Sequence, residues 1–249
     1  MTALNWEGCL NVRDLGGLAT EDGRRTRHGA VVRADNIRKL TDAGWRSLAE
    51  HGVRRIVDLR LPQELATDEP RDVDIDVVHV SVLGEALDEE YIAELDAQLA
   101  SVDDVADHYV YSYVDWLERY REQFGRAFAA VADADADGTV LVHCMGGKDR
   151  TGIVAALLLR LAGVPHATIG EDYAVTAVNL EPSTSRWIPA IEDEVERAKW
   201  ARLAATPAAA MERVVLEIET RYGDVAAYLR AAGLHDAQID RLRNRLAPA

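Results

Sequence analysis

A cysteine and an arginine lie six positions apart in a glycine-rich stretch, and these residue types at this spacing can do phosphate chemistry. The stretch reads His-Cys-Met-Gly-Gly-Lys-Asp-Arg-Thr-Gly from His143 to Gly152. Cys144 can act as a thiolate nucleophile, and the planar guanidinium of Arg150 can hold two oxygens of one phosphate, which a lysine cannot. Average residue frequencies give the pattern His-Cys-x-x-Gly-x-x-Arg-Thr-Gly a chance occurrence of about 10⁻⁸ per position. A buried cysteine beside an arbitrary glycine turn is therefore the weaker interpretation.

The surroundings of Cys144 are those of a phosphate-binding loop. Residues 139–143 are expected to form a buried strand and residues 151–161 an apolar helix, so the N–H groups of the intervening loop converge at a positive helix end. Its two glycines permit the backbone angles and close approach that such a loop requires. These N–H groups and Arg150 favour the thiolate over the thiol. The residues expected to line the phosphate are Met145, Gly146, Gly147, Lys148 and Thr151.

Three side chains around the loop have expected roles of their own. Thr151 could donate a hydrogen bond to the sulfur and ease its departure. His143 is expected to orient the loop through backbone contacts rather than to act as a base. Lys148 can approach a second phosphate or another acidic group of a substrate. The loop neutralises the phosphate by itself, so we expect neither a metal ion nor a cofactor.

Strands that alternate with helices must position this loop. Short apolar runs predict strands at 29–33, 56–59, 77–80 and 139–143. Helical periodicity and capping residues predict helices at 41–50, 85–100, 104–132, 151–161, 166–179, 188–205, 208–222, 224–232 and 236–246. The alternation predicts an α/β fold, with a mainly parallel central sheet flanked by helices and a helical C-terminal part.

Individual segments carry more specific predictions. Thr41 is the expected N-cap of the first helix, with Gly52 as its stop. The aromatic residues of the helical stretch 104–132 are interpreted as core, and the acidic stretch 133–138 as a solvated linker rather than a calcium loop. Pro182 and Pro189 punctuate the chain, so residues 181–205 are expected to leave the core and return as a separate helix. This segment is either a peripheral helical insertion or a lid over the phosphate site.

Composition fits one globular domain over residues 1–249. Hydrophobic residues make up 48% and charged residues 29% of the chain. No apolar run approaches the roughly 18 residues of a membrane span, and no secretory signal is visible at the N-terminus. We expect a cytoplasmic location, with leaderless export left open. The net charge of −15 argues against a nucleic-acid partner. It does not argue against phosphate, because salt screens charges beyond about 8 Å and local cations dominate a pocket.

The same residues resemble the Cys-x5-Arg protein tyrosine phosphatase superfamily, and more closely its bacterial atypical branch with Lys-Asp-Arg-Thr in the loop. The resemblance extends to Asn11-Val-Arg-Asp-Leu-Gly-Gly17 near the N-terminus. It also covers Val32-Arg33-Ala-Asp35, Leu40-Thr41, Asp58-Leu59-Arg60 with Glu64, and the C-terminal stretch from Tyr228 to Leu246, and so nearly the whole chain. It implies activity on phosphotyrosine, and on phosphoserine, phosphothreonine and phosphoinositides in some members.

The resemblance also implies roles for single residues. No Trp-Pro-Asp sequence is present, so Asp149 becomes the candidate general acid, with holding the loop or pairing with Arg13 as its alternative role. Asp35, Asp58 and Asp115 are the next acids to consider. The N-terminal motif is expected to brace the loop. The residues expected to form internal ion pairs are Arg13, Asp14, Arg60 and Glu64.

Two other functional classes compete with a phosphatase. A sulfurtransferase also carries a cysteine in a short loop, and a catalytically silent module could bind phosphorylated proteins without turnover. The helix that starts with Arg-Thr-Gly and the N-terminal motif favour the phosphatase over the first, and the intact Cys144 and Arg150 argue against the second. The other cysteine, Cys9, either packs near Trp6 or traps an oxidised Cys144 as a disulfide.

Overall fold

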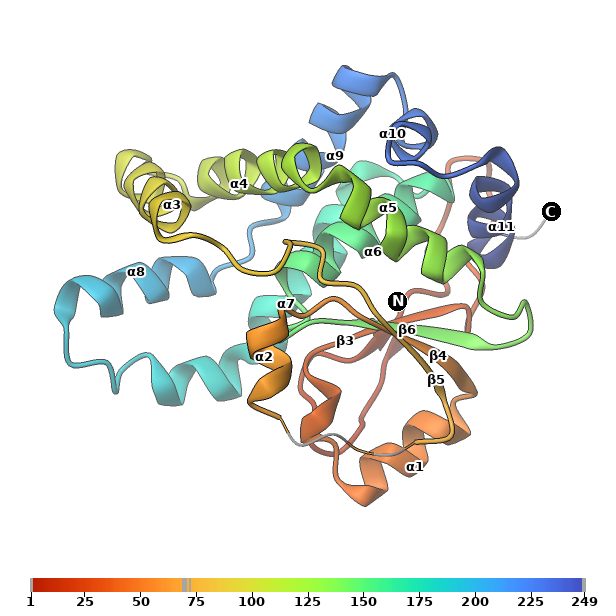
Figure 1. Ribbon diagram of the computed structural model, residues 1–249, viewed down its shortest axis with the longest axis horizontal. Coiled ribbons are helices and arrows are strands. Elements are labelled where there is room, and N and C mark those ends of the chain that lie inside the picture. The colour runs from red at the N-terminus through yellow and green to blue at the C-terminus, as the bar shows by residue number, and fades with distance from the viewer. Residues whose placement is uncertain (1, 69–70, 72, 248–249) are drawn as a thin grey trace.

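A six-stranded sheet runs through the part of the chain that the computed structural model describes, residues 2–68, 71 and 73–247 (Figure 1). The strand order is β1-β2-β3-β6-β4-β5. The four strands β3, β6, β4 and β5 are parallel, and β1 and β2 add an antiparallel edge, so the predicted mainly parallel sheet is confirmed. The strand bounds are β1 Thr2–Ala3, β2 Arg13–Asp14, β3 Val31–Ala34, β4 Val53–Asp58, β5 Asp76–His79 and β6 Thr139–His143.

Helices cover both faces of this sheet (Figure 1). Alternate strand residues face two separate apolar cores: Val31, Val57 and Val140 contribute to the larger one, and Val32, Ile56 and Leu141 to the smaller one beside α1. Strands apolar on both faces are what a covered parallel sheet requires. The helix bounds are α1 Asp42–Glu50, α2 Pro62–Ala66, α3 Glu89–Ser101, α4 Val105–Arg119, α5 Arg121–Ala132, α6 Asp149–Leu161, α7 His166–Trp187, α8 Glu194–Ala204, α9 Ala208–Tyr222, α10 Val225–Ala231 and α11 Asp236–Leu246.

Several predicted helix boundaries are wrong, and the helices expected from residues 85 and 188 begin only at Glu89 and Glu194. The stretch 104–132 is two helices, α4 and α5, because Tyr120 leaves the helical region with φ −112° and ψ 29°. The helix after the loop begins at Asp149 instead of Thr151, so Arg150 belongs to its first turn. Helix α7 does not end near residue 179 but continues through Pro182 to Trp187. The proline removes a hydrogen bond to the carbonyl of Val178, a residue that is 74% exposed, so water can hydrate that carbonyl.

The end of α7 and helix α8 extend away from the sheet as a hairpin, with α8 beside α3 (Figure 1). Lys199 on α8 pairs with Asp96 on α3 at 2.7 Å, and Arg202 donates to the carbonyls of Leu99 and Val102 at 2.9 and 2.6 Å. No residue of α8 is fully buried, and Leu203, in its last turn, is partly buried against the larger core. Within the described residues, no helix is long and apolar enough to cross a membrane.

Candidate active site

The loop from Cys144 to Lys148 connects β6 to α6 at the carboxyl edge of the parallel strands. Cys144 is 1% exposed and opens the loop directly after the central strand. Gly147 has φ +60°, and a Cβ there would lie 2.4 Å from the carbonyl oxygen of Ala34. Only glycine fits this position, because both the backbone angle and the backbone of the neighbouring strand exclude a side chain. The strand–loop–helix arrangement predicted for this stretch is confirmed.

Three successive carbonyls of the loop accept hydrogen bonds from the surrounding structure. The N–H of Asn36 donates to Met145 at 3.0 Å, and Asn11 Nδ2 donates to Gly146 and Gly147 at 3.0 and 3.1 Å. In a trans peptide the carbonyl and the next N–H point in opposite directions. The N–H groups of residues 146–148 are therefore turned away from these partners, and they donate to no other group among the described residues. Backbone N–H groups that lack a partner in this way can bind an anion.

A buried cluster of charges lies behind the loop. Arg13 and Arg33 pair with the single carboxylate of Asp172 at 2.7 and 2.5 Å, and all three side chains are at most 2% exposed. Arg33 also donates to the carbonyl of Gly147 at 2.7 Å. Burial, followed by the neighbouring charge of Arg13, lowers the pKa of Arg33 to about 10. Two guanidinium groups on one carboxylate leave an excess positive charge next to the loop, which favours an anion in it.

Arg150 is held by Glu64, a residue of α2. Its Nη1 and Nη2 donate to the two carboxylate oxygens of Glu64 at 2.5 and 2.8 Å. Burial lowers the pKa of Arg150, but the hydrogen bonds that it donates to Glu64 outweigh burial and leave the pKa raised. Nε of Arg150 makes no hydrogen bond within the described part of the chain. Glu64 therefore fixes the orientation of the guanidinium.

Lys148 contacts the C-terminal end of α8. Its Nζ donates to the Tyr109 hydroxyl at 2.8 Å and to the carbonyl of Leu203 at 2.5 Å, and the Tyr109 hydroxyl donates to the same carbonyl. Burial lowers the pKa of Lys148, but the charge of Asp149 and the contact with Tyr109 outweigh it and the pKa is raised. The lysine is thus charged, 13% exposed and engaged by the α7–α8 hairpin.

Asp149 faces the aromatic residues of α4. The hydroxyl of Tyr113 donates to Asp149 Oδ1, and Lys148 Nζ lies 3.3 Å from the same oxygen. Arg13 is bound elsewhere, to Asp172, so the expected alternative pairing of Asp149 with Arg13 is wrong. The interpretation of the aromatic residues as core is confirmed for the buried rings of Tyr109 and Tyr113, but their hydroxyls also reach the loop.

The remaining predicted residues show mixed outcomes. Nδ1 of His143 lies 3.3 Å from the carbonyl of Cys144, and its Nε2 lies 3.4 Å from Asp58. These contacts fit the expected role of His143, which is to orient the loop. The Thr151 hydroxyl is buried and makes no hydrogen bond to any described residue, so the expected donation to the sulfur is not made in this state. Cys9 donates to the carbonyl of Asn36 at 3.4 Å, and burial and the nearby Asp35 raise its pKa.

The alternative acids have structural partners. Asp35 accepts from the N–H groups of Leu10 and Asn11 at 3.1 and 2.9 Å, and burial raises its pKa despite them. Asp58 pairs with Arg60 at 2.8 Å. Asp115 accepts from Tyr91 and pairs with Arg119 at 3.2 Å. Of the residues expected in ion pairs, Arg13, Arg60 and Glu64 form them. Asp14 accepts from the N–H groups of Gly16 and Gly29, both at 2.7 Å, and its carboxylate lies 3.3 Å from Nε2 of His51.

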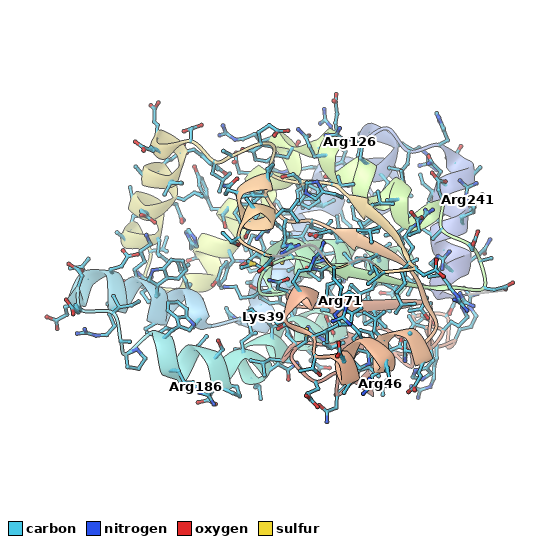
Figure 2. All side chains as sticks on the ribbon, turned by 60° about the horizontal axis from the view of Figure 1, so that its bottom comes forward. Lys39, Arg46, Arg71, Arg126, Arg186 and Arg241 are labelled. Carbon is cyan, nitrogen blue, oxygen red and sulfur yellow. The ribbon has the colours of Figure 1, made fainter. Side chains whose placement is uncertain are left out.

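Several lysine and arginine side chains lie on other parts of the molecule. The labelled side chains in Figure 2 come from several elements and are spread over the molecule rather than collected on one face. No group of three or more His, Cys, Asp or Glu side chains in the described ranges could hold a metal ion. The cations described at or behind the loop are Lys148, Arg150 and the buried pair Arg13 and Arg33.

The chain is similar to known proteins over nearly its whole length. The sequence model of the tyrosine phosphatase family matches residues 4–248. A tyrosine-protein phosphatase from Nostoc commune is 35% identical over 237 residues, which cover 88% of this chain and 75% of that protein. The triple specificity protein phosphatase PtpB from Mycobacterium tuberculosis is 28% identical over 274 residues, covering 96% of this chain and 97% of that protein. The chain belongs to the tyrosine phosphatase family. It is a phosphoric monoester hydrolase that acts on phosphorylated substrates.

Proposed function

We propose that this protein hydrolyses phosphate monoesters through a phosphocysteine intermediate on Cys144. The observation that carries the proposal is the orientation of the loop: its carbonyls of residues 145–147 bond to the surrounding structure, so the opposite N–H groups are free to hold an oxyanion. The buried cysteine stands at the start of this loop, and Arg150 is fixed beside it by Glu64. Preorganised donors of this kind stabilise charge that develops during reaction.

The proposed reaction has two steps. In the first, the Cys144 sulfur attacks phosphorus, the bond from phosphorus to the leaving oxygen breaks, and Asp149 gives that oxygen its proton. In the second, water attacks the phosphocysteine, the Asp149 carboxylate takes a proton from that water, and the sulfur leaves as a thiolate. Arg150 and the N–H groups hold the phosphoryl oxygens throughout. The unpartnered hydroxyl of Thr151 is available to the departing sulfur.

We propose phosphotyrosine as the principal substrate group, with phosphoserine, phosphothreonine and phosphoinositides as further substrates. Two features support the wider range. One relative carries triple specificity in its name. Lys148 supplies a cation next to the phosphate loop, where it can bind a second phosphate or an acidic side chain of a peptide.

The α7–α8 hairpin is the proposed lid. The carbonyl of Leu203, in the last turn of α8, accepts from both Lys148 and Tyr109, and these hydrogen bonds tie this end of the hairpin to the loop. The helix itself buries no residue, and Val195 is 80% exposed. Elements with few buried apolar contacts open at low free energy. An acidic group that draws Lys148 away from Leu203 would loosen the hairpin as the substrate enters.

Initial rates on a matched panel test the proposal. The panel contains phosphotyrosine, phosphoserine and phosphothreonine peptides of one sequence together with mono- and bisphosphorylated phosphoinositides. Cys144→Ser should bind vanadate but lose turnover on every substrate, and Arg150→Lys should be severely impaired because a point charge cannot replace the fork. Arg241→Lys, at an exposed ion pair, is the control and should keep wild-type rates.

The two competing classes are outcomes of the same experiment. Sulfur transfer from thiosulfate to cyanide, without phosphate release, would establish a sulfurtransferase. Tight binding of phosphopeptides without release of phosphate would establish a silent binding module. Activity that EDTA abolishes and a divalent ion restores would also contradict the metal-free mechanism.

A further inference from the structure

Two tyrosines from separate helices form a hydrogen-bonded chain that ends on Asp149. The Tyr113 hydroxyl, on α4, donates to Asp149 Oδ1, and the hydroxyl of Tyr173, on α7, lies 2.8 Å from that of Tyr113. Both tyrosines are 1% exposed. A hydroxyl has a single proton to donate. Because Tyr113 gives its proton to Asp149, Tyr173 must donate to the oxygen of Tyr113, and the chain runs in one direction from Tyr173 to Asp149.

The two oxygens of Asp149 are therefore unequal. Oδ1 accepts from Tyr113 and has the Lys148 ammonium 3.3 Å away. Oδ2 makes no hydrogen bond to a described residue, and the Asp149 side chain is 34% exposed. A proton on Oδ1 would displace the Tyr113 hydrogen bond and face the ammonium. Oδ2 is consequently the oxygen that can carry a proton and exchange it with a ligand or with water.

We propose that Tyr113, supported by Tyr173, is a positioning residue for the general acid: it fixes Oδ1 of Asp149 and leaves Oδ2 to carry the transferred proton. The inference rests on the proposed function, in which Asp149 protonates the leaving oxygen. When Oδ2 gives up its proton, negative charge develops on the carboxylate and the hydrogen bond from Tyr113 becomes charge-assisted. In the second step the same oxygen takes a proton from the attacking water. Tyr113 thus stabilises the carboxylate that exists between the two steps.

Other charged and titratable groups also lie close to Asp149. The loop contributes the charges of Lys148 and Arg150, and α4 contributes His108 and Tyr109. Burial, together with the charge of Asp149, raises the pKa of Tyr113 well above its ordinary value, so its hydroxyl remains a donor across the working range. The lysine also places a positive charge 3.3 Å from Oδ1. A substrate anion that engages Lys148 would offset that charge, whereas the contact from Tyr113 would persist.

Tyr113→Phe removes the hydroxyl and keeps the buried ring. The carboxylate loses a hydrogen bond that favours its charged form, so the acid should hold its proton to higher pH. We expect the alkaline limb of the kcat profile to move up by about one pH unit, with the rate on an alkyl phosphate falling roughly tenfold and the rate on p-nitrophenyl phosphate falling less than about threefold. Tyr173→Phe should shift the limb in the same direction by a smaller amount.

Tyr228→Phe is the matched control. Tyr228 is also fully buried, and its hydroxyl donates at 3.0 Å to the carbonyl of Leu117, away from the loop. This variant loses a buried tyrosine hydroxyl without touching Asp149, so its alkaline limb and its ratio of alkyl to aryl rates should match the wild type. If Tyr113→Phe and Tyr228→Phe lower the rate equally and leave the limb in place, Tyr113 has only a structural role and the inference is wrong.

Asp149→Asn separates this inference from the proposed function. If Asp149 is the acid, this variant should lose the alkaline limb, and adding Tyr113→Phe to it should change the ratio of alkyl to aryl rates no further. If Asp149→Asn keeps the wild-type limb, the assignment of the acid fails. If Asp149→Asn removes the limb while Tyr113→Phe leaves it unmoved, the acid stands and the positioning role of Tyr113 is refuted.

Discussion

Asp172→Asn is the substitution with the largest expected effect on the support of the loop. The carboxylate is 2% exposed and is the shared partner of Arg13 and Arg33. An asparagine of the same size would leave two buried guanidinium groups without a negative charge. Removing one partner from a buried ion pair costs about 3–5 kcal/mol. In a chain of this size about 1 kcal/mol corresponds to about 2 °C in Tm, so we expect Tm to fall by about 6–10 °C.

Urea unfolding and vanadate binding measure the two consequences of Asp172→Asn. Since Arg33 also holds the carbonyl of Gly147, the variant should bind vanadate more weakly as well as unfold more readily. Asp133→Asn is the control, because Asp133 pairs with Arg241 at the surface with both side chains about half exposed. Such a pair contributes about 1 kcal/mol or less. If Asp172→Asn is no more destabilising than Asp133→Asn, the reasoning about the buried cluster is refuted.

The effect of Asp172 also depends on pH with a defined sign. Burial raises the pKa of this carboxyl, but Arg13 and Arg33 outweigh burial and the net pKa is lowered. A lowered folded-state pKa contributes stability above the ordinary aspartate value of about 3.9, and this contribution is lost as the pH falls through the folded-state pKa. The difference in unfolding free energy between wild type and Asp172→Asn should therefore be constant near neutral pH and shrink below about pH 4.

Three further predictions concern the residues around the loop. Glu64→Gln should lose about 1–2 kcal/mol of stability near neutral pH. Arg150 outweighs burial and lowers the pKa of Glu64, so urea titrations should show this loss disappearing below about pH 4, and a loss that persists there would contradict the assignment. In hydrogen exchange, residues 185–203 should exchange faster than the sheet and change protection with vanadate; core-like protection in both states would exclude a lid. Peptide mapping after mild peroxide should find Cys144 oxidised and Cys9 free, because the raised pKa of Cys9 disfavours its thiolate, whereas a disulfide between them would show a resolving role.

The structure of the loop was predictable because its residues are contiguous. Cys144, the glycines and Arg150 lie within seven positions, and the apolar runs on either side predict the strand and the helix that orient them. The support behind the loop is different. Asp172 lies 159 residues from Arg13 and occupies a helix whose sequence gives no sign of a buried charge. Only the fold brings these two residues together.

The contacts of the two tyrosine hydroxyls could not be predicted from the sequence, for a second reason. Tyr113 and Tyr173 have the residue type and the spacing of core positions, and their rings are indeed buried. What their hydroxyls contact depends on which helix faces the loop, and periodicity does not contain that information. Pro182 is an exception to a local rule. Proline disfavours the interior of a helix, yet α7 continues past Pro182.

Trapping the covalent intermediate tests the central claim most directly. Asp149→Asn should slow the second step, because the proposed base for water is lost, while p-nitrophenyl phosphate still reacts in the first step without an acid. Rapid acid quench followed by intact-mass and peptide mass spectrometry should then show one phosphoryl group on the enzyme, located on Cys144. Phosphate release at a measurable rate with no phosphoryl group on Cys144, or with one on another residue, would contradict the phosphocysteine mechanism.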